Sequence, residues 1–322
     1  MSAPRRFDPG STADQVLEGI DLGGRVAIVT GASGGLGGET ARALAARGTA
    51  VTLTARDVQK AERVAAAIRA AHPGAKLAVR PLALERPDSV RAFAKSWLAE
   101  NRVLHLLLNN AGVMACPLAR TPEGWELQFA TNHFGHFLLT ALLAPALRAA
   151  GGARVVNTSS AGHRFSRVVF EDIHYQRRPY DKWGAYGQSK TANVLHALEL
   201  DRRLSSSGVR AFGVHPGMIV TELGRHLGPE DIQQLQSRAK ERSAQGRSSW
   251  KTPPQGAATQ CWAATAPELA GRGGLYLEDC QISGASPPPG GLGAEPWALD
   301  ADDAKRLWSV SEETLGERFA WS

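Results

Sequence analysis

The chain has 322 residues, of which 43% are hydrophobic and 21% charged, a composition typical of a packed globular protein. Its three cysteines lie far apart without metal-ligand spacing, which excludes a disulfide framework and a cysteine metal site. The net charge of +6 comes mostly from scattered arginines, and no apolar stretch could span a membrane, so neither a nucleic-acid partner nor a membrane anchor is indicated. We therefore expect a soluble, cytoplasmic protein with reduced thiols.

Short β-branched runs alternate with amphipathic helical segments along most of the chain. A polar N-terminal extension, residues 1–22, precedes them and carries a short helix signal with Ser11 or Thr12 as its cap. The expected strands are 25–30, 49–55, 76–83, 103–112, 153–160, 209–217 and 273–277. The expected helices are 38–48, 57–71, 87–101, 121–150, 185–204, 253–266 and 302–315.

This alternation predicts an α/β fold, a single-domain, three-layer, doubly wound parallel sheet of the Rossmann type. We expect the domain to cover residues 23–280, with a helix at 121–150 that is disturbed at Pro145. The polar and mostly helical segment 224–253 is predicted to form a lid. Residues 281–322 are predicted to form a Pro/Gly loop followed by a C-terminal helix.

A glycine-rich turn, TGASGGLG, directly follows the first predicted strand and opens the next helix. Phosphate groups need backbone N–H donors at close range and the positive end of a helix dipole, and glycines permit that approach. The position between a strand and a helix is the context that a dinucleotide-binding turn requires. The predicted cofactor contacts in this turn are Gly31, Ser33, Gly35, Leu36 and Gly37.

The end of the second predicted strand indicates which dinucleotide binds. An acidic residue there would hold the ribose 2′-OH of NAD, but the sequence has Ala55 followed by Arg56. Because a guanidinium can pair with a 2′-phosphate, Arg56 favours NADP. The alternative is that Arg56 is a solvated surface residue and that Asp57 only caps the next helix.

Tyr186 and Lys190 are four residues apart in a predicted helix, so both side chains point from one face. A phenol with a pKa near ~10 is a poor base at neutral pH, and a neighbouring ammonium favours the phenolate. Such a pair is common by chance and could be an exposed helical pair. Ser160, at the end of a predicted strand, adds a hydroxyl that could bond a substrate oxygen and the tyrosine, although alone it could be a helix cap.

Further motifs follow in a fixed order: NNAG at 109–112, Asn132 in the long predicted helix, and HPGMIVTEL at 215–223. In the order and spacing of all these motifs, from about residue 23 to 280, the chain resembles the short-chain dehydrogenase/reductase family. Segments such as NHFGHFLL and APELAGRGGLYLEDC make it similar to the retinol-dehydrogenase-like branch. The resemblance implies an NADP-dependent oxidoreductase that transfers a hydride between nicotinamide and a carbonyl or alcohol.

The resemblance also implies a role for each catalytic position. Tyr186 would be the general acid in reduction and the base in oxidation, and Lys190 would lower its pKa and bind the nicotinamide ribose. Ser160 would orient the carbonyl. Asn132 would hold a water that links Lys190 to bulk solvent.

Further cofactor contacts are implied outside the glycine turn. Pro216 and Gly217 would shape the nicotinamide pocket, and Thr221 would reach the carboxamide or the phosphates. The NNAG motif and the catalytic pair would add Asn110, Ala111, Gly112, Tyr186 and Lys190. One position departs from the family pattern: Ala83 occupies the place where many members have an aspartate that contacts the adenine amino group of the cofactor. Adenine recognition must therefore use the backbone or other groups.

The substrate side is less determined by the sequence. Met114, Phe165, Trp183 and Met218 are candidate pocket residues, and each could equally be a core residue. An apolar carbonyl compound is expected by analogy alone.

Two other functions remain open. An NADP-linked reductase of double bonds would use the same tyrosine and lysine, and a catalytically idle, dinucleotide-sensing scaffold would keep only the fold. Many relatives form a homodimer through the helices that hold Asn132 and Tyr186. Burial of those helices inside one chain would explain their apolar faces equally well.

Overall fold

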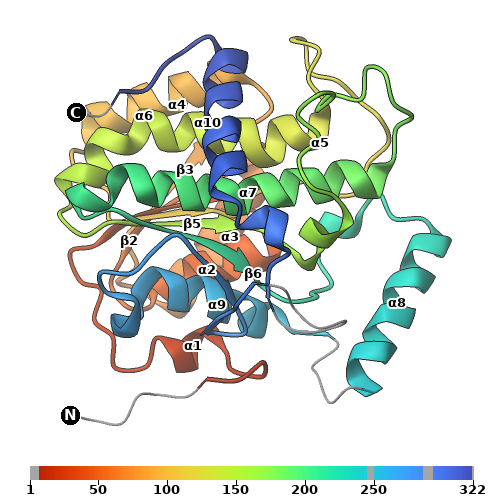
Figure 1. Ribbon diagram of the computed structural model, residues 1–322. Coiled ribbons are helices and arrows are strands. Elements are labelled where there is room, and N and C mark those ends of the chain that lie inside the picture. Colours follow the sequence, from red (N-terminus) through yellow and green to blue (C-terminus); the bar gives the residue numbers. More distant parts are fainter. Residues whose placement is uncertain (1–6, 245–249, 286–292, 321–322) are drawn as a thin grey trace.

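A computed structural model describes residues 7–244, 250–285 and 293–320. The described chain is built around one sheet (Figure 1), with strands β1 Val26–Thr30, β2 Ala50–Ala55, β3 Leu77–Pro81, β4 Leu106–Asn109, β5 Arg154–Thr158, β6 Arg210–His215, β7 Leu275–Glu278 and β8 Gln281–Ile282. Their order in the sheet is β3-β2-β1-β4-β5-β6-β7-β8. All neighbouring strands are parallel except the pair β7 and β8, which is antiparallel.

Helices cover both faces of the sheet and confirm the predicted three-layer, doubly wound α/β fold. One face is covered by α1 Ala13–Val16, α2 Gly35–Ala45, α3 Val58–Ala71 and α9 Pro253–Thr265. The other is covered by α4 Pro87–Glu100, α6 Gly135–Ala149, α7 Lys182–Leu204 and α10 Ala301–Leu315. No helix among the described residues is both long and apolar enough to cross a membrane.

Short-range capping explains where several helices begin. Of the two predicted caps, Ser11 and Thr12, the structure has Thr12, which caps α1 in a capping box with Gln15. Asp57 accepts the backbone N–H of Lys60 at the start of α3. Asp181 caps α7, so this helix begins at Lys182, earlier than the predicted start at residue 185.

The predicted single helix over 121–150 is wrong in two respects. The helical part begins only with α5 Leu127–Phe129, because Glu126 caps it with a side chain that accepts the N–H groups of Gln128 and Phe129. The irregularity lies not at Pro145, which α6 contains without a break, but in the π-helical turn Ala130–Phe134. Single π-turns inside helices are frequent at functional sites, and this one carries Asn132.

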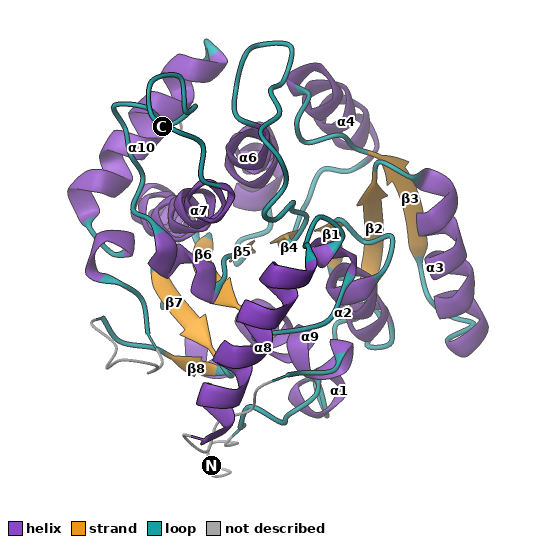
Figure 2. Cartoon of the chain, turned by 90° about the vertical axis from the view of Figure 1, so that its right-hand side faces the viewer, coloured by secondary structure: helices purple, strands orange, loops and turns teal. Residues whose placement is uncertain are grey.

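Helix α8 Pro229–Ala244 stands apart from both helical layers (Figure 1, Figure 2). It falls inside the segment predicted as a lid, of which residues 245–249 lie outside the described part. The same holds for residues 286–292 of the predicted Pro/Gly loop and for residues 1–6 and 321–322. The described part of that loop is not only surface, since Ala294 and Ala298 are buried against Tyr276.

Candidate active site

A cleft of about 1270 Å³ opens at the carboxyl ends of the parallel strands. Thr30, Thr158 and His215, the last residues of β1, β5 and β6, line it. The strand order reverses at β1, which lies between β2 and β4, and open α/β sheets bind ligands at such a point. Pockets for one drug-sized ligand usually measure roughly 300–1000 Å³, so this cleft has room for a dinucleotide and a second molecule.

All predicted site residues except one line this single cleft. Asn132 is the exception, and its side chain is fully buried. The lining includes Gly31, Ser33, Gly35, Leu36, Gly37, Arg56, Asn110, Ala111, Gly112, Ser160, Tyr186, Lys190, Pro216, Gly217 and Thr221.

The glycine-rich turn has no room for side chains at two positions. At Gly31, where φ is +66°, a Cβ would lie 2.8 Å from the Cα of Ala111. At Gly37 it would lie 2.4 Å from the carbonyl oxygen of Gly31. Because α2 begins at Gly35, the first backbone N–H groups of that helix have no partner within it. This cradle fits the pyrophosphate of a dinucleotide.

A buried hydrogen-bond network joins the glycine turn to the NNAG motif. Thr30 Oγ1 accepts the N–H groups of Asn110 and Ala111, each at 2.9 Å, and lies 2.8 Å from Nε2 of His136. His136 Nδ1 lies 3.0 Å from the Asn132 carbonyl oxygen, which can only accept, so Nδ1 carries the proton and Thr30 donates to Nε2. Burial lowers the pKa of His136 to about 4, which keeps this ring neutral.

The end of β2 carries an arginine with most of its side chain open to solvent. Arg56 lies 3.4 Å from a carboxylate oxygen of Glu85 and is 57% exposed. The neighbouring Asp57 is engaged in capping α3. Lys60, one turn into that helix, also lines the cleft and pairs with Glu222 on the opposite lip. Two cations therefore lie beside the position expected for the adenosine ribose.

The wall beyond β3 is apolar. Ala83 itself does not line the cleft, and its N–H donates to the Ser89 hydroxyl at 3.0 Å. Leu82 and Leu84 line the cleft on either side of it. A ring bound here would meet aliphatic side chains.

Tyr186 and Ser160 meet at the inner end of the cleft. The Ser160 hydroxyl accepts the N–H of Gly162 at 3.0 Å, and its interaction with the Tyr186 phenol lowers the pKa of that phenol. The Tyr186 ring packs on Gly162, where a Cβ would lie only 2.6 Å from Cε1 of the ring. Burial raises the pKa of the Tyr186 phenol to about 12, and the Ser160 interaction partly offsets this rise. The phenol is therefore protonated at neutral pH.

Lys190 lies one turn further along α7, as the spacing predicts. Its ammonium donates to the Thr158 carbonyl oxygen at 3.0 Å and lies 5.6 Å from the centre of the Tyr186 ring. Burial lowers the pKa of Lys190 to about 8. The lowering of the Tyr186 pKa by Lys190 stays a prediction.

Asn132 is fixed rigidly behind the cleft. Its amide accepts the N–H of Val113 at 2.8 Å and donates to the Val113 carbonyl at 3.0 Å and to the Ser189 hydroxyl at 2.9 Å. Gly112 separates it from Lys190, since a Cβ there would lie 3.1 Å from Asn132 Oδ1 and 3.5 Å from Lys190 Nζ. The two side chains thus lie close together across a glycine.

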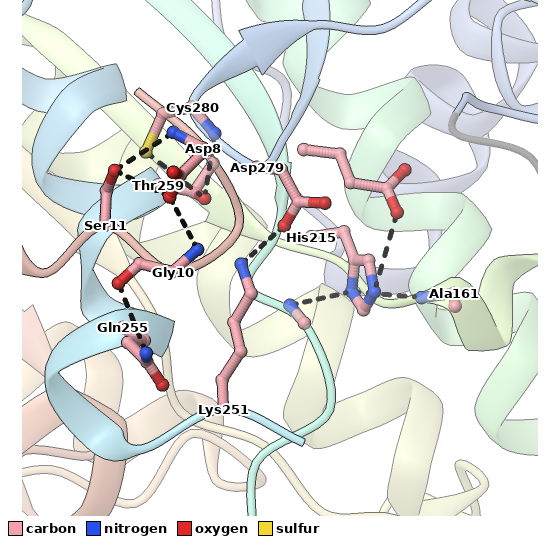
Figure 3. Close-up of polar contacts among 12 residues, drawn as sticks. Asp8, Gly10, Ser11, Ala161, His215, Lys251, Gln255, Thr259, Asp279 and Cys280 are labelled. Atoms are coloured by element: carbon pink, nitrogen blue, oxygen red, sulfur yellow. Dashed lines mark hydrogen bonds and ion pairs between the residues drawn. The ribbon is translucent and has the colours of Figure 1, made fainter. Parts of the chain in front are cut away.

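The loop 216–221 forms the lip above the glycine turn. Thr221 packs over Gly35, where a Cβ would lie 3.3 Å from its methyl group. Gly217, with φ at +99°, leaves space for Lys251, whose ammonium makes a buried ion pair with Asp279 at 2.5 Å (Figure 3). The lip is therefore supported from behind by a charge pair.

The outer part of the cleft is lined by apolar side chains. All four candidate pocket residues line it, and Phe165 and Trp183 contact each other edge to face with ring centroids 5.7 Å apart. The segment predicted as a lid contributes α8 and its flanks, but the sequence analysis did not single out the apolar residues that it adds, Leu227, Ile232, Leu235 and Trp250. Four of the large apolar side chains that are exposed lie around this mouth, namely Phe165, Val220, Ile232 and Trp250.

Two histidines at the site were also missed by the sequence analysis. His136 joins Thr30 to Asn132, and His215 contacts the segments that follow Ser160 and Pro216. Both lie inside quoted motifs, NHFGH and HPG. A histidine four residues after the site asparagine, on the same helical face, was the available signal for His136.

Comparison with known proteins gives the family. The model of the short chain dehydrogenase family matches residues 25–231. A probable oxidoreductase of Streptomyces antibioticus is 42% identical over 302 residues, which cover 92% of this chain and 99% of that protein. Retinol dehydrogenase 12 of Homo sapiens is 41% identical over 321 residues, covering 99% of this chain and 95% of that protein.

Solved structures agree with the sequence relatives. The crystal structure of an uncharacterized protein from Mycobacterium paratuberculosis has a TM-score of 0.74 and 33% identity, covering 97% of this chain and all of that one. Pseudomonas aeruginosa RhlG, in an NADP active-site complex, has a TM-score of 0.63 and 25% identity, covering 80% of this chain and 95% of that one. With a matching cleft, family model and relatives, the chain is an oxidoreductase of the short-chain dehydrogenase family, similar to its retinol dehydrogenases.

Proposed function

We propose that this protein is an NADP-dependent oxidoreductase that reduces a carbonyl, or oxidises the corresponding alcohol, on an apolar substrate. The observation that carries the proposal is the convergence of Ser160, Tyr186 and Lys190 at the inner end of the cleft that begins at the glycine turn. All the groups assigned to proton transfer therefore lie where a substrate oxygen can reach them.

Arg56 supports the choice of NADP. A bound dinucleotide would supply the hydride, with its phosphates at the glycine cradle and its ribose beside the end of β2. A guanidinium that is mostly exposed and held by one long contact to Glu85 is available for a 2′-phosphate. Lys60 adds a second positive charge on the same side. RhlG, solved with NADP, is a relative with the same fold.

The residues at the inner end of the cleft would supply the proton to the substrate carbonyl oxygen. Tyr186, protonated at neutral pH, would donate its proton to the carbonyl oxygen as that oxygen gains charge. The Ser160 hydroxyl, which lines the cleft beside Tyr186, would bond the same oxygen and orient it. Lys190 would stabilise the resulting phenolate, and Asn132 would hold the water that reconnects Lys190 to solvent.

The outer part of the cleft supports an apolar substrate. Its walls carry Phe165, Trp183 and Trp250, together with aliphatic residues of α8. We propose that α8 and the segment around it act as the lid predicted over 224–253. In the described part, the ammonium of Lys182 and the indole N–H of Trp183 both bond Asp231 at the start of α8, at 2.6 and 3.2 Å.

The test is a titration with NADPH and NADH, followed by product analysis with a ketone, an aldehyde and an enone of similar size. The proposal expects tighter binding of NADPH and an alcohol as the product, with the double bond of the enone intact. A saturated ketone from the enone would instead indicate a double-bond reductase. Binding of nucleotide without turnover of any of the three would indicate an idle sensing protein.

The predicted homodimer loses one argument in the structure. Helix α10 lies over α6 and α7 (Figure 1). The ring centroids of Phe137 and Trp308 are 4.7 Å apart, and Nε2 of His133 lies 2.8 Å from the Ser311 hydroxyl oxygen. Burial within one chain therefore explains the apolar faces of these helices. Homodimer formation and a cytoplasmic location both stay predictions, and light scattering on the purified protein measures the first.

A further inference from the structure

His215 is the last residue of β6 and lies between the segment that follows Ser160 and the loop 216–221. Its Nδ1 accepts the N–H of Ala161 at 3.2 Å and the N–H of Gly217 at 3.4 Å. Ala161 directly follows Ser160, and Gly217 belongs to the loop 216–221. In Figure 3 the His215 ring lies between the two segments, with its dashed contact to the labelled Ala161. One ring atom therefore connects the serine segment to the opposite lip.

The hydrogen bonds determine the tautomer of this ring. Backbone N–H groups can only donate, so the Nδ1 that faces two of them carries no proton. The ring proton must then be on Nε2, which faces a carboxylate oxygen of Glu278 at 3.9 Å. Both side chains are almost fully buried. A carboxylate on this side favours a proton at Nε2 and so keeps Nδ1 free to accept.

The Ala161 N–H is also a group that needs an acceptor. It is the first N–H of the short 3₁₀ helix Ala161–Phe165, and the Ser160 hydroxyl already accepts the next one, from Gly162. Without His215, the Ala161 N–H would lose its acceptor next to Ser160, which lines the cleft together with Tyr186. The resulting movement would affect the geometry of the reacting groups directly.

The hairpin behind His215 supports this arrangement. Glu278 is followed by Asp279 and Cys280, which both have positive φ values, +51° and +55°, in the tight turn between β7 and β8. This turn points consecutive carboxylates at the active-site lip: Glu278 at His215, and Asp279 at Lys251 beneath Gly217. The Lys251 N–H also bonds the Met218 carbonyl oxygen at 2.8 Å.

We propose that His215 is a positioning residue: its unprotonated Nδ1 holds the Ser160 segment and the loop 216–221 in register, with the ring proton on Nε2, the side of Glu278. The proposal rests on the proposed function, because its effect on rate is exerted through Ser160 and Tyr186. Misplacement of reacting groups by about 1 Å can lower the rate roughly 10²-fold, so loss of the His215 contacts can produce a measurable fall in kcat.

The test compares two amide replacements. In His215→Asn the side-chain oxygen can occupy the position of Nδ1, whereas in His215→Gln the amide extends toward the position of Nε2. We expect kcat of the asparagine variant to stay within about threefold of the wild type and kcat of the glutamine variant to fall about 10- to 100-fold. A titration with NADPH separates an effect through the loop 216–221, which carries predicted cofactor contacts, from an effect through the Ser160 segment.

His105→Gln is the matched control. His105 Nδ1 also accepts a backbone N–H between strands, that of Val26 at 3.1 Å, but at the amino ends of β1 and β4, away from the cleft. This variant should keep wild-type kcat. The proposal is overturned if the asparagine and glutamine variants of His215 fold and have the same kcat, whether both are high or both are low.

A second measurement does not depend on turnover. Long-range ¹⁵N–¹H correlation spectra of labelled protein distinguish histidine tautomers, and the signal absent from His215→Asn identifies His215. The proposal expects the Nε2–H form. If the wild type reduces no carbonyl, the proposed function fails while this spectrum still decides the hydrogen-bond geometry, and an Nδ1–H form overturns the inference.

Discussion

The two ends of the cleft are held in different ways. In the inner wall, Tyr186 and Lys190 are almost fully buried and Ser160 partly so, with Asn132 buried behind them, and Asn132, Ser160 and Lys190 have hydrogen-bond partners within the chain. The outer wall, formed by α8 with Phe165, Trp183 and Trp250, is partly exposed, and its helix is attached through Asp231. This difference indicates chemistry that is preorganised and a substrate site that can adapt.

The largest expected effect comes from the inner wall. Tyr186→Phe removes the proton donor and keeps the packing on Gly162, so kcat should fall about 10²- to 10⁴-fold while NADPH affinity is nearly unchanged. Steady-state kinetics and a fluorescence titration measure the two quantities. Tyr175→Phe is the control, because burial raises the pKa of Tyr175 to about 12 as well, outside the cleft. Equal rates for the two variants would remove Tyr186 from the mechanism.

The next effect concerns the cofactor. Arg56→Ala should weaken NADPH binding about 10- to 100-fold, because charged hydrogen bonds to phosphate contribute roughly 1.5–3 kcal/mol. NADH binding should stay the same, and the difference should shrink at high salt. Arg80→Ala is the control, because it removes an arginine of the neighbouring strand β3 that pairs with Glu100 at the end of α4. An unchanged ratio of the two affinities would contradict the assignment of Arg56.

Lys190 gives a test of burial through stability. Its folded pKa of about 8 lies below the ordinary 10.5, so between these values the unfolded chain binds more protons and stability rises with pH. Without added nucleotide, the unfolding free energy of the wild type relative to Lys190→Met should rise by about 1.4 kcal/mol per pH unit from pH ~8 to ~10. Denaturant titrations at several pH values measure this slope. If the difference in unfolding free energy between the wild type and Lys190→Met did not change with pH, Lys190 would be solvated in the folded protein.

The smallest effect is expected at the outer wall. Asp231→Asn removes the charge that pairs with Lys182, and a partly exposed pair contributes about 0–1 kcal/mol. KM for an apolar carbonyl should rise by up to about fivefold, with kcat within twofold. Asp88→Asn, which breaks an exposed pair with Arg86, should change neither. A loss in kcat as large as that of Tyr186→Phe would show that α8 is part of the preorganised wall.

The residues that meet at the inner end of the cleft could be singled out from the sequence because the patterns that mark them are local. A glycine turn after a strand and a tyrosine four residues before a lysine are patterns within one or two elements. Their meeting in one cleft follows from parallel strands, whose carboxyl ends share an edge of the sheet. The family resemblance then supplied the serine and asparagine.

What the sequence could not predict depends on contacts between distant residues. The Asp231–Lys182 pair joins positions 49 apart, and the Nε2 of His136 reaches Thr30 across 106 positions. The wrong helix start before α5 has a local cause, because Gly124 adopts a φ of +85° and Glu126 caps the helix with an unusual side chain for that role. The π-turn at Asn132 has no comparable signal in periodicity.

Helix α10 has a consequence for how the protein behaves in dilute solution. Its residues Trp308 and Ser311 contact α6 and the turn before it, where a neighbouring subunit could otherwise lie. An enzyme completed by a second copy loses specific activity when it is diluted below the dissociation constant of the pair. Here the C-terminal segment fills that place within the same molecule. Dilution should therefore cause no loss of specific activity through separation of a pair at this face.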